Sequence, residues 1–103
     1  MYVDVQVRRL NGTAEFDCLV SGGVGERTVL WSKTDANGTR RMLFINEAPF
    51  EAPPRYRSSR AHDAAGYTLN IERIDASDDA EYTCEIQQLV KASAHLTVLG
   101  IYS

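Results

Sequence analysis

Hydrophobic and polar residues alternate in short segments along most of the chain. Such a period of two places every second side chain on one face of a β-strand, so each segment is predicted to form a strand with one buried face. Turn-forming residues separate the segments at intervals of about 8–12 residues, and no segment has the longer period of an amphipathic helix. The predicted strands are residues 3–7, 14–20, 29–32, 41–46, 67–71, 82–87 and 94–98.

Many short strands with one apolar face each predict an all-β fold, an antiparallel β-sandwich in which two sheets bury their inner faces. Residues 75–79 are expected to form a short helical turn between two strands. Pro49, Pro53 and Pro54 exclude their stretch from a central strand, because proline cannot donate a ladder hydrogen bond.

The length of the chain predicts a single domain. It has 103 residues, of which 44% are hydrophobic, enough for one core but not two. We expect this domain to span residues 1–100, with residues 101–103 as the start of a linker or a frayed end. The net charge of −3 and the absence of a dense Lys/Arg run do not indicate a nucleic-acid or anionic-membrane partner. No apolar run approaches the ~18 residues of a membrane span, so membrane attachment is expected only through other parts of a longer chain.

The two cysteines, Cys18 and Cys84, indicate a disulfide. They are 66 positions apart, whereas zinc sites use closely spaced ligands, so no metal site is expected. A bridge closing a loop of this length would stabilise the fold by about 4 kcal/mol in the chain-entropy model. Two buried free thiols in a cytosolic protein are the alternative.

Two N-glycosylation motifs favour an extracellular location. Asn11-Gly12-Thr13 and Asn37-Gly38-Thr39 both match N-x-[ST]. Asn-Gly is also a strong hairpin signal, so each motif is equally consistent with a plain turn. Together with a disulfide, two sequons in exposed turns are typical of a secreted or cell-surface protein.

Catalysis is not expected. A catalytic site needs a nucleophile, a base and a stabilising group in one pocket, and a disulfide leaves no cysteine free. His62 and His95 have no evident partners in the sequence, and a solvated surface position is the simpler interpretation for His95. The glycine-rich residues 22–25 lack the Gly-Lys-Ser/Thr of a phosphate loop. No cofactor and no small-molecule substrate are therefore predicted.

The cysteines belong to a wider pattern that resembles the immunoglobulin fold of variable or intermediate type. Trp31 follows Cys18 by thirteen positions, and residues 78–84 read D-x-A-x-Y-x-C. The resemblance implies structural roles for four further residues. Trp31 would pack against the disulfide, and Tyr82 would form a tyrosine corner. Arg55 and Asp78 would form an ion pair across the end of the sandwich. A simple cap of the helical turn is the alternative role for Asp78.

A narrower resemblance concerns the first immunoglobulin domain of Lachesin-, Amalgam- and IgLON-like cell-adhesion proteins, which are related to the Dpr and DIP groups. It is carried by residues 12–18, 29–35, 55–56, 67–71 and 81–84. It implies an extracellular recognition or adhesion domain that binds itself, as a homodimer, or a related immunoglobulin protein.

The outer face of the sheet formed by the predicted strands 94–98, 82–87, 29–32 and 41–46, which correspond to strands G, F, C and C′ of the immunoglobulin fold, is the expected binding surface. Apolar residues there should form a patch of about a few hundred Å², with Met42 and Phe44 as central anchors and polar residues at the rim. The expected partner-binding residues are Leu30, Ser32, Met42, Phe44, Glu85, Gln87, Leu89 and His95. Cover by another part of the chain or by another domain is the alternative explanation for these apolar residues.

Two other functions remain open from the sequence. One is a structural spacer in a multidomain muscle or matrix protein, for which free thiols would be typical. The other is an immune-type receptor that binds through loops 21–27 and 88–91, although both loops lack the Tyr/Ser-rich composition of antibody paratopes.

Overall fold

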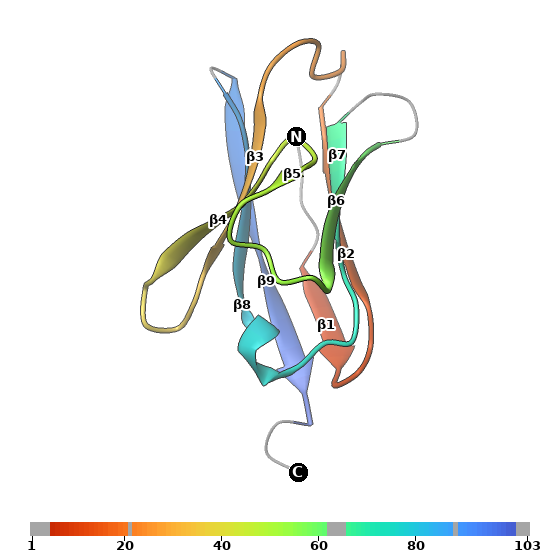
Figure 1. Ribbon diagram of the computed structural model, residues 1–103, viewed down its shortest axis with the longest axis vertical. Coiled ribbons are helices and arrows are strands. Elements are labelled where there is room, and N and C mark those ends of the chain that lie inside the picture. Colours follow the sequence, from red (N-terminus) through yellow and green to blue (C-terminus); the bar gives the residue numbers. More distant parts are fainter. Residues whose placement is uncertain (1–4, 21, 62–65, 88, 101–103) are drawn as a thin grey trace.

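Two sheets pack face to face in the structure, a computed structural model that describes residues 5–20, 22–61, 66–87 and 89–100 (Figure 1). The larger sheet has the strand order β1-β9-β8-β3-β4-β5, and the smaller one β2-β7-β6. Neighbouring strands are antiparallel except β1 and β9, which run parallel. This confirms the predicted all-β immunoglobulin-like sandwich. The strands are β1 (Gln6–Arg9), β2 (Ala14–Leu19), β3 (Val29–Thr34), β4 (Arg40–Ile45), β5 (Ala48–Pro49), β6 (Tyr56–Arg60), β7 (Gly66–Ile71), β8 (Ala80–Ile86) and β9 (Val90–Leu99).

Helical structure in the described chain is limited to η1, the 3-10 turn Ala76–Asp78 between β7 and β8. It lies where the sequence predicts a helical turn. No helix in these residues is long and apolar enough to cross a membrane. The expected linker or frayed end at residues 101–103 lies outside the described residues.

A disulfide joins the two sheets through the core. Cys18 on β2 is bonded to Cys84 on β8, with 6.3 Å between their Cα atoms. Trp31 is the direct register partner of Cys84 and is fully buried. Tyr82 lies two residues before Cys84, also fully buried, with its ring stacked on Phe16 at a centroid distance of 5.2 Å. The disulfide expected from the sequence is thus present, and the core is built around it.

A polar network closes one end of the sandwich around Asp78, which is 0% exposed. The guanidinium of Arg55 donates to both carboxylate oxygens of Asp78, at 2.7 and 3.1 Å. The hydroxyl of Tyr56 donates to the same carboxylate at 2.5 Å and lies 2.9 Å from the hydroxyl of Tyr82. Lys33 Nζ donates to the Tyr56 hydroxyl at 3.2 Å. The buried carboxylate is therefore fully compensated.

Asp78 also caps the helical turn. Its carboxylate accepts a hydrogen bond from the backbone N–H of Asp75 at 2.9 Å, which completes a capping box in η1. Its own backbone carbonyl accepts from the Tyr82 hydroxyl at 2.7 Å, the geometry of a tyrosine corner. The two roles that the sequence left as alternatives, cap and ion pair, are combined in one side chain.

A β-bulge changes the facing of residues on β4. The register between β3 and β4 shifts between Trp31 and Ser32, so that Leu43 is an extra residue between the pairs Trp31–Phe44 and Ser32–Met42. Phe44 shares the inward side of its partner Trp31, and both Leu43 and Phe44 are buried, at 1% and 3% exposure. The prediction that Phe44 lies on the outer face is therefore wrong, because simple alternation does not hold through a bulge.

Candidate protein-binding face

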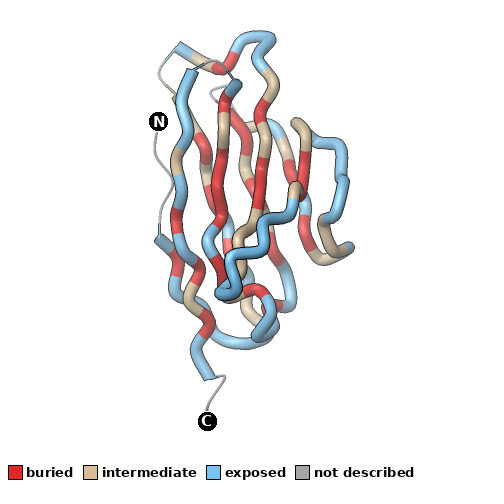
Figure 2. The backbone as a smooth tube through the Cα atoms, turned by 90° about the vertical axis from the view of Figure 1, so that its left-hand side faces the viewer, coloured by how far each residue is buried: buried red, intermediate tan, exposed pale blue. Residues whose placement is uncertain are grey.

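The outer face of the large sheet is defined by the residues that alternate with the core positions of β9, β8, β3 and β4. Because directly paired residues share one side of a sheet, the register arranges them in three rows. Figure 2 looks onto this sheet and shows buried positions alternating with more exposed ones along its strands. The upper row is Lys91, Glu85, Leu30 and Ile45; the middle row is Ser93, Thr83, Ser32 and Met42; the lower row is His95, Glu81, Thr34 and Arg40.

Three half-buried apolar residues form the centre and the β4 side of this outer face. Leu30 and Ile45 are direct partners in the upper row, and Met42 lies at the end of the middle row. Ile45 takes the outward position that the sequence assigned to Phe44. The sequence gives no sign that Ile45, and not Phe44, faces outward, because the bulge depends on the pairing of two strands and not on local alternation.

Small side chains line the middle of the outer face. Ser32 is 2% exposed and Thr83 is 6% exposed. Thr83 Oγ1 lies 2.7 Å from Ser93 Oγ. Ser32, which the sequence predicts as a partner-binding residue, therefore offers almost no surface to a partner. The middle row thus has small side chains at Ser32, Thr83 and Ser93, and a large one at Met42.

Further apolar residues lie exposed near the ends of the sheet. Leu89 and Val90, at the turn between β8 and β9, are 45% and 38% exposed. Phe50 follows the edge strand β5 and is 67% exposed, although its backbone N–H donates to the Leu43 carbonyl at 2.8 Å. Leu89 was expected from the sequence. Phe50 was missed, because it lies in the proline-containing stretch for which no strand was predicted.

His95 has a partner that the sequence did not reveal. Its Nε2 lies 2.8 Å from the Asp79 carboxylate, which also accepts from the backbone N–H of Val98 at 2.9 Å. Burial disfavours the charged form of Asp79, but these two hydrogen bonds outweigh it and hold the pKa of Asp79 below its ordinary value. His95 is therefore tied to the start of β8 while half of its side chain stays exposed.

Three other charged side chains of the outer face have no ion-pair or hydrogen-bond partner among the described residues. Arg40 and Glu81 are exposed, and Glu85 is half-buried, in the part of the chain that the structure describes. None of these three side chains forms an ion pair or hydrogen bond with another described residue. Of these three, the positive charge lies on β4 and the two negative charges on β8, and Lys91 on β9, the register partner of Glu85, adds a second positive charge.

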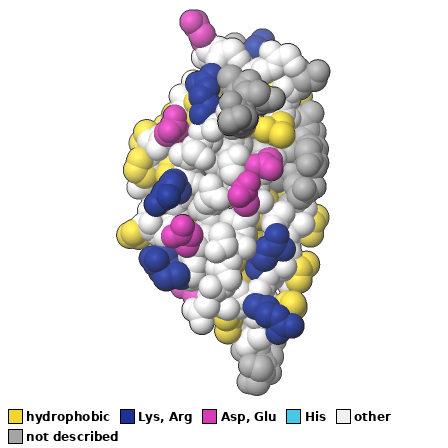
Figure 3. Space-filling view, turned by 90° about the vertical axis from the view of Figure 1, so that its right-hand side faces the viewer, with side chains coloured by type: hydrophobic (Ala, Val, Ile, Leu, Met, Phe, Trp, Pro, Cys, Tyr) yellow, Lys and Arg dark blue, Asp and Glu magenta, His cyan; other side chains and the backbone are white. Residues whose placement is uncertain are grey.

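The small sheet presents a different surface. Figure 3 shows the molecule from this side, with basic and acidic side chains interspersed. Glu15, Asn70 and Arg57 are neighbours across its three strands. A mixture of charged and polar groups is typical of a solvated face, so the described residues of this side make it the weaker candidate for a protein interface.

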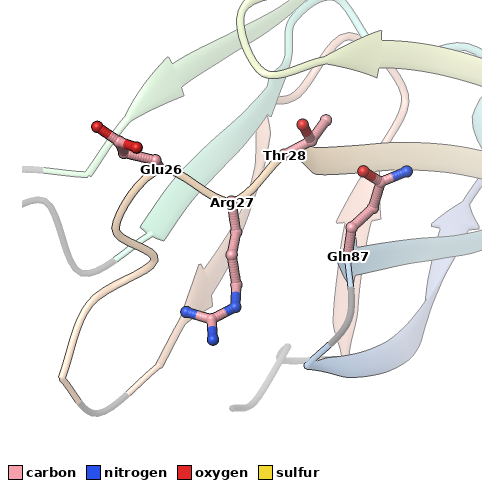
Figure 4. A pocket seen from close by; sticks show the side chains of 4 residues that line it. All are labelled: Glu26, Arg27, Thr28 and Gln87. Carbon is pink, nitrogen blue, oxygen red and sulfur yellow. The ribbon is translucent and has the colours of Figure 1, made fainter.

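A polar hollow of about 450 Å³ lies at the end of the sandwich near the start of β3. It is lined by Glu26, Arg27, Thr28 and Gln87, and Figure 4 shows these side chains pointing in different directions. Groups that do not converge cannot fix a small ligand. Gln87, expected at the binding rim, is exposed here beyond the end of β8.

The described residues also include no cluster of His, Cys, Asp or Glu suited to a metal ion.

A disulfide-bridged sandwich with a tyrosine corner and a tryptophan on the bridge defines an immunoglobulin-type domain. The family model described as the immunoglobulin I-set domain matches residues 3–99, so the chain belongs to that family.

Two comparisons relate the chain to known proteins. It is 33% identical over 85 residues to Lachesin of Drosophila melanogaster, an alignment that covers 79% of this chain and 22% of Lachesin. The chain thus spans about a fifth of the length of that relative. Among solved structures, it resembles the one described as the RIG-5 IG1 homodimer, with a TM-score of 0.78 and 26% identity over 91% of this chain and 88% of that one. The resemblance to Lachesin predicted from the motifs is confirmed.

Proposed function

We propose that this domain is an extracellular, cell-surface recognition or adhesion domain, and not an enzyme, that binds an immunoglobulin-type protein through its outer face. The partner is either the same protein or a related one. The observation that carries the proposal is the half-buried apolar group Leu30, Ile45 and Met42, surrounded by charged groups without partners in the described chain. An apolar centre with a polar rim is the usual composition of a protein interface.

The partner-binding residues of this proposal are a revised set. Leu30 and Met42 stay as apolar anchors, and Ile45 takes the place of Phe44. Glu85, Gln87 and His95 form the polar rim, and Leu89 extends the surface at the turn between β8 and β9.

Two similar proteins support the proposed recognition or adhesion function. Lachesin is a relative by sequence, and RIG-5 IG1, a structural neighbour, is described as a homodimer. The Cys18–Cys84 disulfide supports an extracellular location, because structural disulfides persist in oxidising compartments. The same disulfide argues against the alternative of an intracellular spacer domain, for which free thiols would be typical.

Sedimentation velocity on the isolated domain and its variants tests the proposal. The unmodified domain would be followed alone, and mixed with related immunoglobulin cell-surface domains, from roughly 1 to 500 μM, where weak domain pairs dissociate. Leu30→Asp and Met42→Asp should each abolish the association while the thermal midpoint of unfolding stays high, because both side chains lie on the outer face.

Leu19→Asp is the matched control. Leu19 is a half-buried leucine on β2, in the small sheet, so this variant introduces the same charge on the opposite side. It should associate like the unmodified domain. Unchanged association of both Leu30→Asp and Met42→Asp would show that the outer face is not the interface.

A further inference from the structure

We infer that the cleft between the β3–β4 hairpin and η1 binds an acidic sugar, that is, a sugar unit that carries a carboxylate and free hydroxyl groups. The cleft has a volume of about 180 Å³ and is lined by Lys33, Asp35, Thr39, Arg41 and Ser77. Lys33 and Arg41 lie on the inner side of the hairpin, opposite to the outer face that carries the proposed function. The inference therefore goes beyond that function and does not depend on it.

The cleft exists because the hairpin extends beyond the small sheet. Lys33 follows Trp31 on the inner side of β3 and pairs with Arg41 on β4. Tyr82, the partner of Lys33 on β8, is fully buried, whereas Arg41 is exposed. The small sheet ends at β6, and Figure 1 shows the end of the hairpin pointing away from it. Inward positions that no second sheet covers can therefore hold charged residues.

Two cations in the cleft have hydrogen-bond donors to spare. Arg41 forms no ion pair or hydrogen bond with another residue of the described chain. Lys33 Nζ donates one of its three hydrogens to the Tyr56 hydroxyl at 3.2 Å, and it lies 3.9 Å from an oxygen of Asp78, beyond hydrogen-bond distance. An anionic group between Lys33 and Arg41 would accept these free donors. A carboxylate suits this place, because a guanidinium can bind it through both oxygens.

The charge of Lys33 is disfavoured in the free domain. Burial lowers the pKa of its ammonium group below the ordinary value of 10.5, against the opposing effect of Asp78 and Asp75. The positive charges of Arg55 and Arg41 lower this pKa further. An anion bound between Lys33 and Arg41 would relieve the repulsion between them and raise the pKa of Lys33.

The remaining groups of the cleft favour a ligand with hydroxyl groups over a bare anion. Asp35 contributes a carboxylate, which repels an inorganic anion but accepts hydrogen bonds from sugar hydroxyls. One of its oxygens accepts from the N–H groups of Asn37 and Thr39, at 3.0 Å each, and this fixes the side chain. The Ser77 hydroxyl donates to Asp75 and can accept from the ligand. A pair of cations beside a fixed acceptor thus matches a sugar that carries one carboxylate.

A comparison of three related ligands tests the inference. Glucuronate has a sugar ring and a carboxylate, acetate has the carboxylate without the ring, and glucose has the ring without the carboxylate. Each ligand is added up to about 50 mM at constant ionic strength, because a ligand of this size in an open cleft binds in roughly the millimolar range. The readout is the side-chain NMR signal of isotope-labelled lysine, which the chain contains at two positions, Lys33 and Lys91.

Glucuronate should shift the Lys33 signal until the cleft is saturated. It should also raise the pKa of Lys33 in a pH titration, because the bound carboxylate stabilises the ammonium form. Acetate and glucose should each bind at least about tenfold more weakly, since each makes only part of the contacts. Lys91, an exposed lysine on β9, is the internal control, and its signal should not shift.

Two variants of neighbouring arginines locate the carboxylate. Arg41→Gln removes one cation of the cleft and should weaken glucuronate binding at least about tenfold. Arg40→Gln, at the next position on the opposite side of β4, is the matched control and should change the binding by less than about twofold at constant ionic strength. Both positions are exposed, so both variants should keep the thermal midpoint of the unmodified domain.

Three results would overturn the inference. If glucuronate gives no saturable shift of Lys33, the cleft does not bind acidic sugars. If acetate binds as tightly as glucuronate, the cleft accepts any carboxylate and the assignment to a sugar is wrong. If Arg41→Gln and Arg40→Gln bind glucuronate equally, the carboxylate does not lie at Arg41. Each of these results leaves binding through the outer face untouched, so the inference and the proposed function can fail separately.

Discussion

Arg55 holds the buried carboxylate of Asp78 with two hydrogen bonds, one to each oxygen, across 23 positions of sequence. The same guanidinium nitrogen that lies 2.7 Å from Asp78 also donates to the carbonyls of Glu72 and Arg73, at 3.0 Å each. One side chain thereby connects the start of β6, the segment after β7, and η1. Arg55 thereby stabilises the end of the sandwich at which Asp78 is buried.

Removal of Arg55 should destabilise the domain strongly. Arg55→Ala leaves Asp78 as a buried charge without its main partner, a change that costs about 3–5 kcal/mol in comparable buried pairs. Urea unfolding followed by the fluorescence of Trp31 measures the free energy of unfolding. Arg57→Ala, at an exposed arginine two residues further on in β6, is the control and should change this free energy by less than about 0.5 kcal/mol. An equal effect of both variants would contradict the assignment.

Stability should fall at acid pH through Asp78. Burial disfavours its ionised form, but hydrogen bonds from Arg55, Tyr56 and the Asp75 N–H outweigh burial and hold the pKa of Asp78 below the ordinary value of 3.8. The unfolded chain therefore binds this proton more readily than the folded one. The stabilisation is complete above about pH 5 and is lost as the pH falls below about 4, through the lowered pKa.

Urea unfolding at a series of pH values from 7 to 2 measures this dependence. Asp78→Asn should be less stable at neutral pH and should lose less stability on acidification than the unmodified domain. Glu15→Gln, at an exposed position without a partner in the described chain, should follow the unmodified curve. A curve for Asp78→Asn parallel to the unmodified one would show that other carboxylates control the acid transition.

Gly66 should not tolerate any side chain. A Cβ atom at this position would lie 1.7 Å from the carbonyl oxygen of Cys18 on the neighbouring strand, which is backbone and cannot move aside cheaply. Gly66→Ala should therefore lower the free energy of unfolding by at least about 3 kcal/mol or prevent folding. Gly25→Ala is the control. Gly25 has a φ of 60° but no atom within 4 Å of the added Cβ, so only the backbone strain of about 1–2 kcal/mol applies. Thermal unfolding distinguishes the two variants.

Asn37 and Asn11 should carry N-linked glycans when the protein is made in secretory cells. Both side chains lie in exposed turns, and the turn at Asn37 is held by Asp35, whose carboxylate accepts from the N–H groups of Asn37 and Thr39 at 3.0 Å. Intact-mass measurement before and after glycosidase treatment should give a two-glycan shift, and Asn37→Gln should remove one glycan. An unshifted mass would mean that both motifs are plain turns.

Most of the strand pattern was predictable because alternation is local. The inward residues Phe16, Cys18, Leu69 and Tyr82 each lie in a segment whose neighbours alternate regularly. β1 departs from the rule: Gln6 is buried at 8% exposure, while Val5 and Val7 are 69% and 50% exposed. A four-residue edge strand paired on one side does not need its valines inside, so hydrophobicity alone does not fix its facing.

The binding face was only partly predictable for a related reason. Its strands and most outward positions follow from alternation, but Phe44 and Ile45 exchange places because of the bulge opposite Trp31. The partnership of His95 with Asp79, 16 positions apart, depends on the register of β8 with β9. Both features arise from pairing between strands, which no local pattern in the sequence encodes.

The two margins of the large sheet limit how it can grow. At one margin β5 is two residues long and ends in Pro49, which has no N–H, and the next two N–H groups are used on β4. At the other margin the guanidinium of Arg8 covers the carbonyl of Val7 on its own strand, at 2.8 Å. Among the described residues, these features disfavour growth of the large sheet by pairing of an incoming strand at either margin. With its margins blunted in this way, the large sheet is left with its outer face as the surface on which a partner can dock.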